Sequence, residues 1–203
     1  MARSDDAMLR FTFSLIILLI LSCLLQQFLP AITVWHNARI LLLALVFVCA
    51  AVSLPTPAML VLAFIAGFLW DAQQTILQNP GDPMVYEQPA DAIRFGSSII
   101  LFAMMGFFMQ GIQPVFRQGK WHISALSTGV AILLYQLVEI FILSFIRGHF
   151  LLTNSILIQI SATSLLTMLL SPLVFWLIFR TADFFNYKIR FDGRKKRRQS
   201  RSF

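Results

Sequence analysis

Glu139 is the residue of this chain whose type and position most strongly suggest chemistry. It is the only acid near the centre of a long apolar run, residues 123–145. The polar residues that share its face at helical spacing are Ser124, Thr128 and Tyr135, with Gln136 beside them. A carboxylate in the middle of a membrane span costs on the order of 3 kcal/mol. We therefore expect this face to point into a helix bundle.

Two roles are open for Glu139. Intramembrane acids often serve as proton or cation sites, as in a small proton-coupled carrier. The alternative is cohesion, in which a protonated or paired carboxyl joins its helix to the last helix through Ser164 or Thr167. We favour cohesion, because no second acid or base stands in the middle of an apolar run. The predicted intramembrane polar network comprises Tyr135, Gln136, Glu139, Ser164 and Thr167.

A second acid, Asp71, ends the apolar stretch 57–71. Ala63 and Gly67 precede it at intervals of four, so in a helix all three lie on one face that another helix can approach closely. Two roles are open for this face. It is either a packing or partner contact, or Asp71 beside Trp70 simply ends a helix in water at the membrane boundary. Further small residues at which helices or partners can pack closely are Gly106 and Gly111.

The sequence contains no arrangement of residues typical of an enzyme or a metal site. The histidines lie in connections on differing sides and the cysteines lie inside apolar runs, at His36, His122, His149, Cys23 and Cys49. A nucleotide-binding glycine loop, a Gly-x-Ser-x-Gly elbow and a His-Glu-x-x-His helix are all absent from the sequence. We therefore predict a protein that is not an enzyme and that needs no metal or cofactor.

The composition is that of a membrane protein. Of the 203 residues, 58% are hydrophobic and 12% are charged, whereas about a quarter of the residues in soluble domains are charged. Much of the net charge of +7 comes from a cluster near the C-terminus, Arg194, Lys195, Lys196, Arg197 and Arg198. Basic residues beside a span orient it or contact anionic lipid more often than they bind nucleic acid. We predict contact with membrane lipid and no nucleic-acid partner.

The apolar runs predict an all-α polytopic bundle of six transmembrane helices in one domain, residues 1–186, followed by a basic cytoplasmic tail, residues 187–203. The predicted spans are 10–32, 40–54, 57–71, 95–116, 123–145 and 155–179. Pro55 and Pro57 break the chain into two short helices, which are either two thin spans or one broken crossing. We favour six crossings with both termini cytoplasmic, because a proline break at mid-depth would expose backbone groups to lipid.

Three stretches carry a resemblance to a known family. The run 57–71 ends in a Gly-x-x-x-Asp sequence, Gly67 to Asp71. Phe95-Gly96-Ser97-Ser98 opens the next run, and Glu139 lies late in the run after that. Together with the length, the helix count and the basic end, these stretches resemble the MreD family, bacterial rod-shape-determining membrane proteins. The chain departs from many members in its longer acidic connection, residues 73–94.

The resemblance implies a non-enzymatic scaffold of the cell-elongation machinery in the bacterial cytoplasmic membrane. It would bind the periplasmic protein MreC. With the actin-like MreB filament, the polymerase RodA and a penicillin-binding transpeptidase, it would organise lateral peptidoglycan synthesis and hence cell shape. Gly67 and Asp71 would then lie at a helix contact.

The alternative is the substrate-binding S-component of an energy-coupling-factor vitamin transporter. Such subunits also have six helices and a similar length, and the MreD fold resembles theirs. They usually dock their transporter through an Ala-x-x-x-Ala face on the first helix. Because residues 11–29 contain no alanine, we favour the scaffold.

Overall fold

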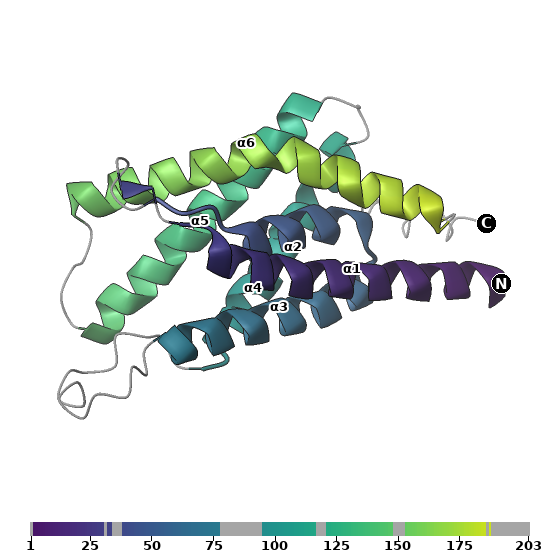
Figure 1. Ribbon diagram of the computed structural model, residues 1–203, viewed down its shortest axis with the longest axis horizontal. Helices are drawn as coiled ribbons and strands as arrows, with labels where there is room; N and C mark the ends of the chain where they lie inside the picture. The colour runs from purple at the N-terminus through teal and green to yellow at the C-terminus, as the bar shows by residue number, and fades with distance from the viewer. Residues whose placement is uncertain are drawn as a thin grey trace, which may run out of the picture.

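The described part of the chain is built from six α-helices (Figure 1). A computed structural model describes residues 2–30, 32–33, 38–77, 95–116, 121–147, 153–185 and 187. The helices are α1 (Ala2–Phe28), α2 (Leu42–Ser53), α3 (Thr56–Leu77), α4 (Ser97–Phe116), α5 (Trp121–Arg147) and α6 (Asn154–Phe184). The prediction of an all-helical bundle is confirmed for these residues. Outside the helices, Ile32 and Ala38 form an isolated backbone bridge.

Prolines explain one helix boundary. α2 ends at Ser53 and α3 begins at Thr56, so the break lies at Pro55, as predicted. Proline has no N–H group and disfavours the helical conformation in the residue before it. Pro57 lies in the first turn of α3, where its missing N–H would have no partner within the helix. Pro172, by contrast, lies inside α6, which continues past it.

Most helix ends differ from the predicted spans by a few residues, and the differences are largest at the end of α3 and the start of α1. α3 continues to Leu77, although the prediction ended it at Asp71, where the acid was expected to mark the membrane boundary. Asp71 is instead buried and hydrogen-bonded within the protein, so the helix has no reason to end there. α1 begins at Ala2 rather than at residue 10, because residues 2–9 contain neither proline nor glycine to stop a helix.

α2 is the central helix of the bundle and contacts each of the other five helices (Figure 1). Its side chains from Leu43 to Ser53 are all buried. A helix of 12 residues is ~18 Å long, well short of the ~30 Å of bilayer hydrocarbon. A helix that is apolar on all faces is expected to be surrounded by protein. α2 has this pattern and forms the core of the molecule.

Side chains from neighbouring helices satisfy the first backbone N–H groups of this region. The Leu43 N–H donates to Oε1 of Gln26 in α1 at 2.9 Å. The Leu41 N–H donates to Oγ1 of Thr167 in α6 at 3.4 Å. A helix leaves its first four N–H groups without internal partners, and in an apolar interior an unpaired group is costly. α1 and α6 therefore provide the partners that water provides at an exposed helix end.

Amide side chains of α4 serve the other end of α2. Nε2 of Gln113 donates to the Val52 carbonyl at 2.8 Å, and Nε2 of Gln110 donates to the Leu54 carbonyl at 3.3 Å. Oε1 of Gln110 also accepts the Thr56 hydroxyl at 3.0 Å. These bonds join the break between α2 and α3 to α4. The backbone and hydroxyl groups at the break therefore find partners within the protein.

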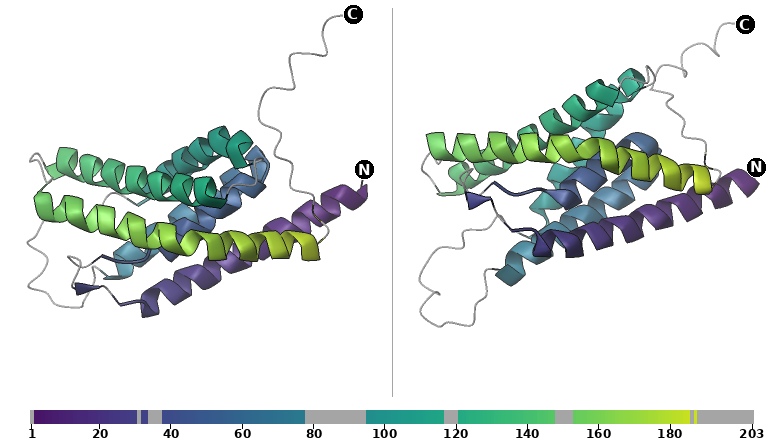
Figure 2. Two further views of the ribbon diagram at one scale, coloured as in Figure 1. Left: turned by 90° about the horizontal axis from the view of Figure 1, so that it is seen from above. Right: turned by 45° about the horizontal axis from the view of Figure 1, so that its top comes forward.

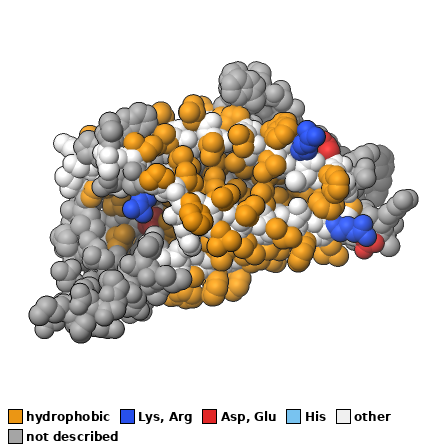
Figure 3. All heavy atoms as spheres, in the orientation of Figure 1, with side chains coloured by type: hydrophobic (Ala, Val, Ile, Leu, Met, Phe, Trp, Pro, Cys, Tyr) orange, Lys and Arg blue, Asp and Glu red, His pale blue; other side chains and the backbone are white. Residues whose placement is uncertain are grey.

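Four of the described helices are long and apolar enough to span a membrane. They lie within Asp6–Phe28, Thr56–Gln74, Ile123–Ile146 and Asn154–Phe184. α2 and the apolar part of α4, Ser97–Gln113, are shorter. The middle of the face in Figure 3 is apolar, and the charged side chains in view lie toward its ends. The chain therefore has the character of a membrane-spanning protein.

The first and last helices place their outer termini at one end of the bundle. The N-terminus of α1 and the C-terminus of α6 lie at the same end, in Figure 1 and in both views of Figure 2. α5 and α6 form an antiparallel pair that packs side by side. Residues 73–77 of the predicted acidic connection, 73–94, lie in α3, and residues 78–94 lie outside the described residues. Of the predicted basic tail, 187–203, only Tyr187 is described.

Candidate functional site

The face that carries Ala63, Gly67 and Asp71 is turned into the bundle. Ala63 is 1% exposed, and Gly67 is buried one turn further along α3. A Cβ atom added at Gly67 would collide with the backbone N and Cα of Ile99 in α4. Only glycine permits two helices to approach so closely. This face therefore packs against the chain's own α4, and a partner protein would have to contact a different surface.

Asp71 connects α3 to the start of α4. Its side chain is 6% exposed, and its Oδ2 atom accepts the Gly96 N–H at 2.6 Å. Gly96 has a φ of +99°, a left-handed conformation that favours glycine. It directly precedes Ser97, the first residue of α4, where a negative charge is favourable at the positive end of the helix dipole. The interpretation of Asp71 as an acid that ends a helix in water is wrong.

The other predicted small residues differ from each other. A Cβ atom at Gly106 would meet Phe47 of α2 and Met59 of α3, so this glycine is an internal packing position. Gly111 is exposed and has no other atom within 4 Å of where its Cβ would be. Among the described residues, Gly111 is therefore an open position and not a packing position.

Glu139 lies beside residues of α3 rather than beside α6. Its carboxylate interacts electrostatically with Trp70 and Asp71, and Tyr135 interacts with both acids. Trp70 and Tyr135 also pack together, with ring centroids 6.1 Å apart. This group, Trp70, Asp71, Tyr135 and Glu139, is called the acid cluster below. This cluster joins the C-terminal half of α3 to the C-terminal half of α5, next to the start of α4.

Several buried donors of this region lack a partner in good geometry. The indole N–H of Trp70 lies beside the Glu139 carboxylate, and the Tyr135 hydroxyl lies beside Ser98. No atom of the described residues accepts either of them in good hydrogen-bond geometry, and the same holds for Nε2 of Gln136. Unpaired buried polar groups are rare in proteins and tend to mark functional places or bound water.

The predicted link from Glu139 to the last helix is wrong. Oγ of Ser164 donates to the Gly129 carbonyl of α5 at 2.6 Å. Thr167 donates to the Thr163 carbonyl of its own helix at 2.6 Å and accepts the Leu41 N–H. The hydroxyl strip of α6 therefore holds α5 and the segment before α2. Glu139 instead interacts with Trp70 and Asp71 of α3. The prediction failed because helical spacing alone does not reveal which neighbouring helix each face meets.

Sequence reasoning missed two kinds of residue in this core. Gly129 was not singled out, yet a Cβ atom there would lie 2.9 to 3.1 Å from the Met168 side chain, so it sets the approach of α5 to α6. The amides of Gln26, Gln110 and Gln113 were also passed over as cap partners of α2. A glutamine within an apolar run was the available signal, since each must find a hydrogen-bond partner in the bundle.

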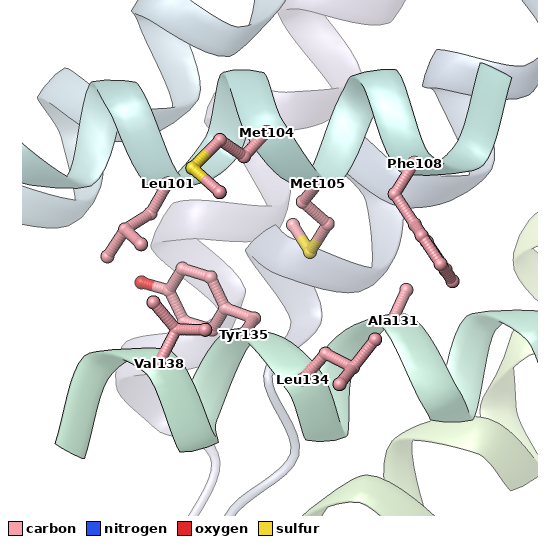
Figure 4. A pocket seen from close by; sticks show the side chains of 8 residues that line it. All are labelled: Leu101, Met104, Met105, Phe108, Ala131, Leu134, Tyr135 and Val138. Carbon is pink, nitrogen blue, oxygen red and sulfur yellow. The ribbon is translucent and has the colours of Figure 1, made fainter. Parts of the chain in front are cut away.

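An apolar groove separates α4 from α5 on the outside of the bundle (Figure 4). Its volume is about 200 Å³. The side chains that line this α4–α5 groove are Leu101, Met104, Met105, Phe108, Ala131, Leu134, Tyr135 and Val138. The Tyr135 hydroxyl is the one polar side-chain group in that lining, so the groove suits a hydrocarbon or helical occupant far better than a polar ligand.

Comparisons with known proteins identify no relative of this chain. No family model matches the chain, and no curated protein or solved structure is significantly similar to it. Among the described residues, no three histidine, cysteine, aspartate or glutamate side chains come together where they could hold a metal ion. The geometry in hand is thus a buried joint between α3 and α4, an acid cluster beside it and an apolar groove along α4 and α5.

Proposed function

We propose that the chain is a non-enzymatic membrane scaffold of the bacterial cell-elongation complex, similar to MreD proteins. One observation carries this proposal. Two stretches that both carry the resemblance lie on the consecutive helices α3 and α4 and meet in space, where Asp71 accepts the Gly96 N–H and Gly67 abuts Ile99. Consecutive helices usually pack together, so the support lies in which residues make the contact, namely Gly67, Asp71 and Gly96 of the stretches that carry the resemblance.

The distribution of polar groups supports a scaffold. The glutamines, serines and threonines with described hydrogen bonds between helices hold α2 and its neighbours in place. The outer faces, in contrast, carry large exposed apolar side chains such as Phe13, Phe64 and Leu169. A protein of this kind works by offering shaped apolar surfaces to other membrane helices, whose association depends on close packing.

The partners of the proposed scaffold follow from the resemblance. They are the periplasmic protein MreC and, directly or indirectly, MreB, a RodA-type polymerase and a penicillin-binding transpeptidase. The location would be the cytoplasmic membrane, with six crossings and both termini in the cytoplasm. That orientation agrees with the shared end of α1 and α6 and with the basic residues that follow α6 in the sequence.

Co-purification tests the proposal. The full chain, tagged and extracted in mild detergent from its own cells, is expected to retain an MreC-like protein and a wall polymerase. Gly67→Leu should lose these partners because it separates α3 from α4, whereas Gly111→Leu at an open position should keep the bundle intact. Recovery of the wild-type chain alone, under conditions that preserve other membrane complexes, would count against the scaffold.

The S-component alternative gains little from the geometry. A vitamin carries several polar groups, and binding sites for such ligands usually place a few polar side chains around them. The α4–α5 groove offers a single hydroxyl among eight side chains. Tight binding of a vitamin by the purified chain would nevertheless revive that alternative.

A further inference from the structure

The α4–α5 groove is open to whatever surrounds the bundle. Four of its side chains are exposed, Met104, Phe108, Leu134 and Val138. They alternate with the buried side chains that form its floor, among them Met105 and Ala131. In a membrane such a groove is filled either by lipid chains or by the side of another helix, because water is absent at that depth.

The lining suits a helix. Ala131 is a small residue at the floor, which allows another backbone to come close. Met104 and Met105 contribute flexible, polarisable thioethers that adapt to the shape of a bound surface (Figure 4). Their side chains come from α4, while Leu134 and Val138 form the opposite wall on α5, so an occupant would contact both helices at once.

A carboxylate lies just beyond this groove. Glu139 follows Tyr135 by one helical turn on the same face of α5, and it is adjacent in sequence to Val138, which lines the groove. Its side chain is partly exposed. The described side chains that interact with it are Trp70, Asp71 and Tyr135, and none of these three carries a positive charge.

The buried side of Glu139 is lined by donors. The Trp70 indole and the Tyr135 ring are both more than nine-tenths buried, and the N–H and O–H groups of these side chains lack an acceptor in good geometry. The carboxylate can accept from them by small movements. No basic side chain among the described residues interacts with Glu139, so its exposed side can pair with a cation of a partner by charge complementarity.

We propose that the α4–α5 groove binds a transmembrane helix of a partner protein and that a lysine or arginine of that helix pairs with Glu139. The groove supplies apolar contact, and the ion pair fixes the depth and register of the partner helix. This inference deepens the proposed function and rests on it only for the identity of the partner. A lipid chain would fill the groove without using Glu139.

Photo-crosslinking in native membranes tests the groove. The full chain carries a photoreactive amino acid in place of Met104 or Leu134, or, as matched controls on exposed apolar faces elsewhere, in place of Ile17 or Leu169. Mass spectrometry then identifies the attached peptide. We expect both groove positions to link to one membrane-spanning segment that contains lysine or arginine, with a yield about tenfold above the controls.

Variants of Glu139 test the ion pair. Glu139→Gln keeps the size of the side chain and its ability to accept from Trp70 and Tyr135, so the bundle should unfold at the wild-type temperature while the yield of adduct falls about tenfold. Glu139→Lys should abolish the adduct, and changing the basic residue of the linked helix to glutamate should restore it. This rescue shows a direct pair, which a merely structural role of Glu139 would not produce.

Four outcomes overturn the inference. They are adducts with lipid only, adducts with a second copy of this chain, a linked helix without a basic residue, and a yield that Glu139→Gln leaves unchanged. The two proposals fail separately. If wall-synthesis proteins co-purify but the groove links only to lipid, the proposed helix-binding role of the groove is wrong and the proposed scaffold function stands. If the groove links to a helix with a basic residue from a protein without a role in wall synthesis, the helix-binding role of the groove stands and the proposed scaffold function is wrong.

Discussion

Gly67 and Asp71 act as one joint between α3 and α4, and each contributes what the other cannot. Gly67 removes the side chain that would keep the helices apart, since its Cβ position is occupied by the backbone of Ile99. Asp71 provides the polar bond across the same seam, to the N–H of Gly96. A Gly-x-x-x-Asp sequence therefore serves both close approach and capping.

Gly67→Ala is expected to destabilise the bundle. The added methyl group meets backbone atoms of α4, which cannot move aside as a flexible side chain would, and overpacking of this kind costs ~1–3 kcal/mol. The apparent unfolding temperature of the purified chain in detergent should fall by several degrees. Gly111→Ala is the matched control on α4, because nothing lies near its Cβ position. Equal unfolding temperatures for the two variants would remove the special role of Gly67.

The sequence predicted which residues matter at this scale better than it predicted their partners. Helical spacing placed Ala63, Gly67 and Asp71 on one buried face. Small residues indicated close packing correctly at Gly67 and Gly106 but not at Gly111. Helical spacing could not show that the face meets α4 of the same chain, because Asp71 and Gly96 are 25 residues apart. Nor could it place Glu139 beside Trp70 instead of Ser164, since several helices were available to each polar face.

At the scale of elements, α2 determines the architecture. It is too short to span a bilayer by itself, and its ends depend on side chains from α1, α4 and α6. The sequence predicted that α2 is short and that a break follows near Pro55, because apolar run length and proline act locally. The bonds at its ends join residues up to 126 positions apart, and no local pattern specifies such pairs.

Gln113→Leu tests the support of α2. It fits the same space but leaves the Val52 carbonyl without the amide that donates to it at 2.8 Å, and an unsatisfied buried acceptor costs ~1–3 kcal/mol. The unfolding temperature in detergent should therefore fall. Gln110→Leu is the comparison, and its smaller expected loss follows from its longer bond of 3.3 Å and its partial exposure. A greater loss for Gln110→Leu would show that the α2 end is supported differently.

At the scale of the whole molecule, the bundle has two unlike ends and an apolar middle. The N-terminus of α1 and the C-terminus of α6 share one end (Figures 1 and 2). Arg10 lies in the N-terminal part of α1 and Arg180 in the C-terminal part of α6, so both basic residues belong to the helix parts that reach this end. Termini at a shared end agree with an even number of crossings, as in the six that we favoured from the proline break at Pro55.

Cysteine labelling in intact cells tests this orientation. After Cys23 and Cys49 are changed to alanine, single cysteines replace exposed residues at the two ends, Asp6 and Asp183 at one and Arg39 and Asn154 at the other. A reagent that does not cross membranes should label positions 39 and 154 from outside and leave 6 and 183 unlabelled until the cells are opened. Labelling of 6 but not 183 from outside would require an odd number of crossings.

Cell width after depletion is the measurement that most directly tests the scaffold role. Loss of a subunit that organises lateral wall synthesis is expected to give wider, rounded cells. Wild-type chain or Gly111→Leu supplied from a second gene copy should restore the rod shape, whereas Gly67→Leu should not. Unchanged cell width after complete depletion of the chain would contradict the proposed function.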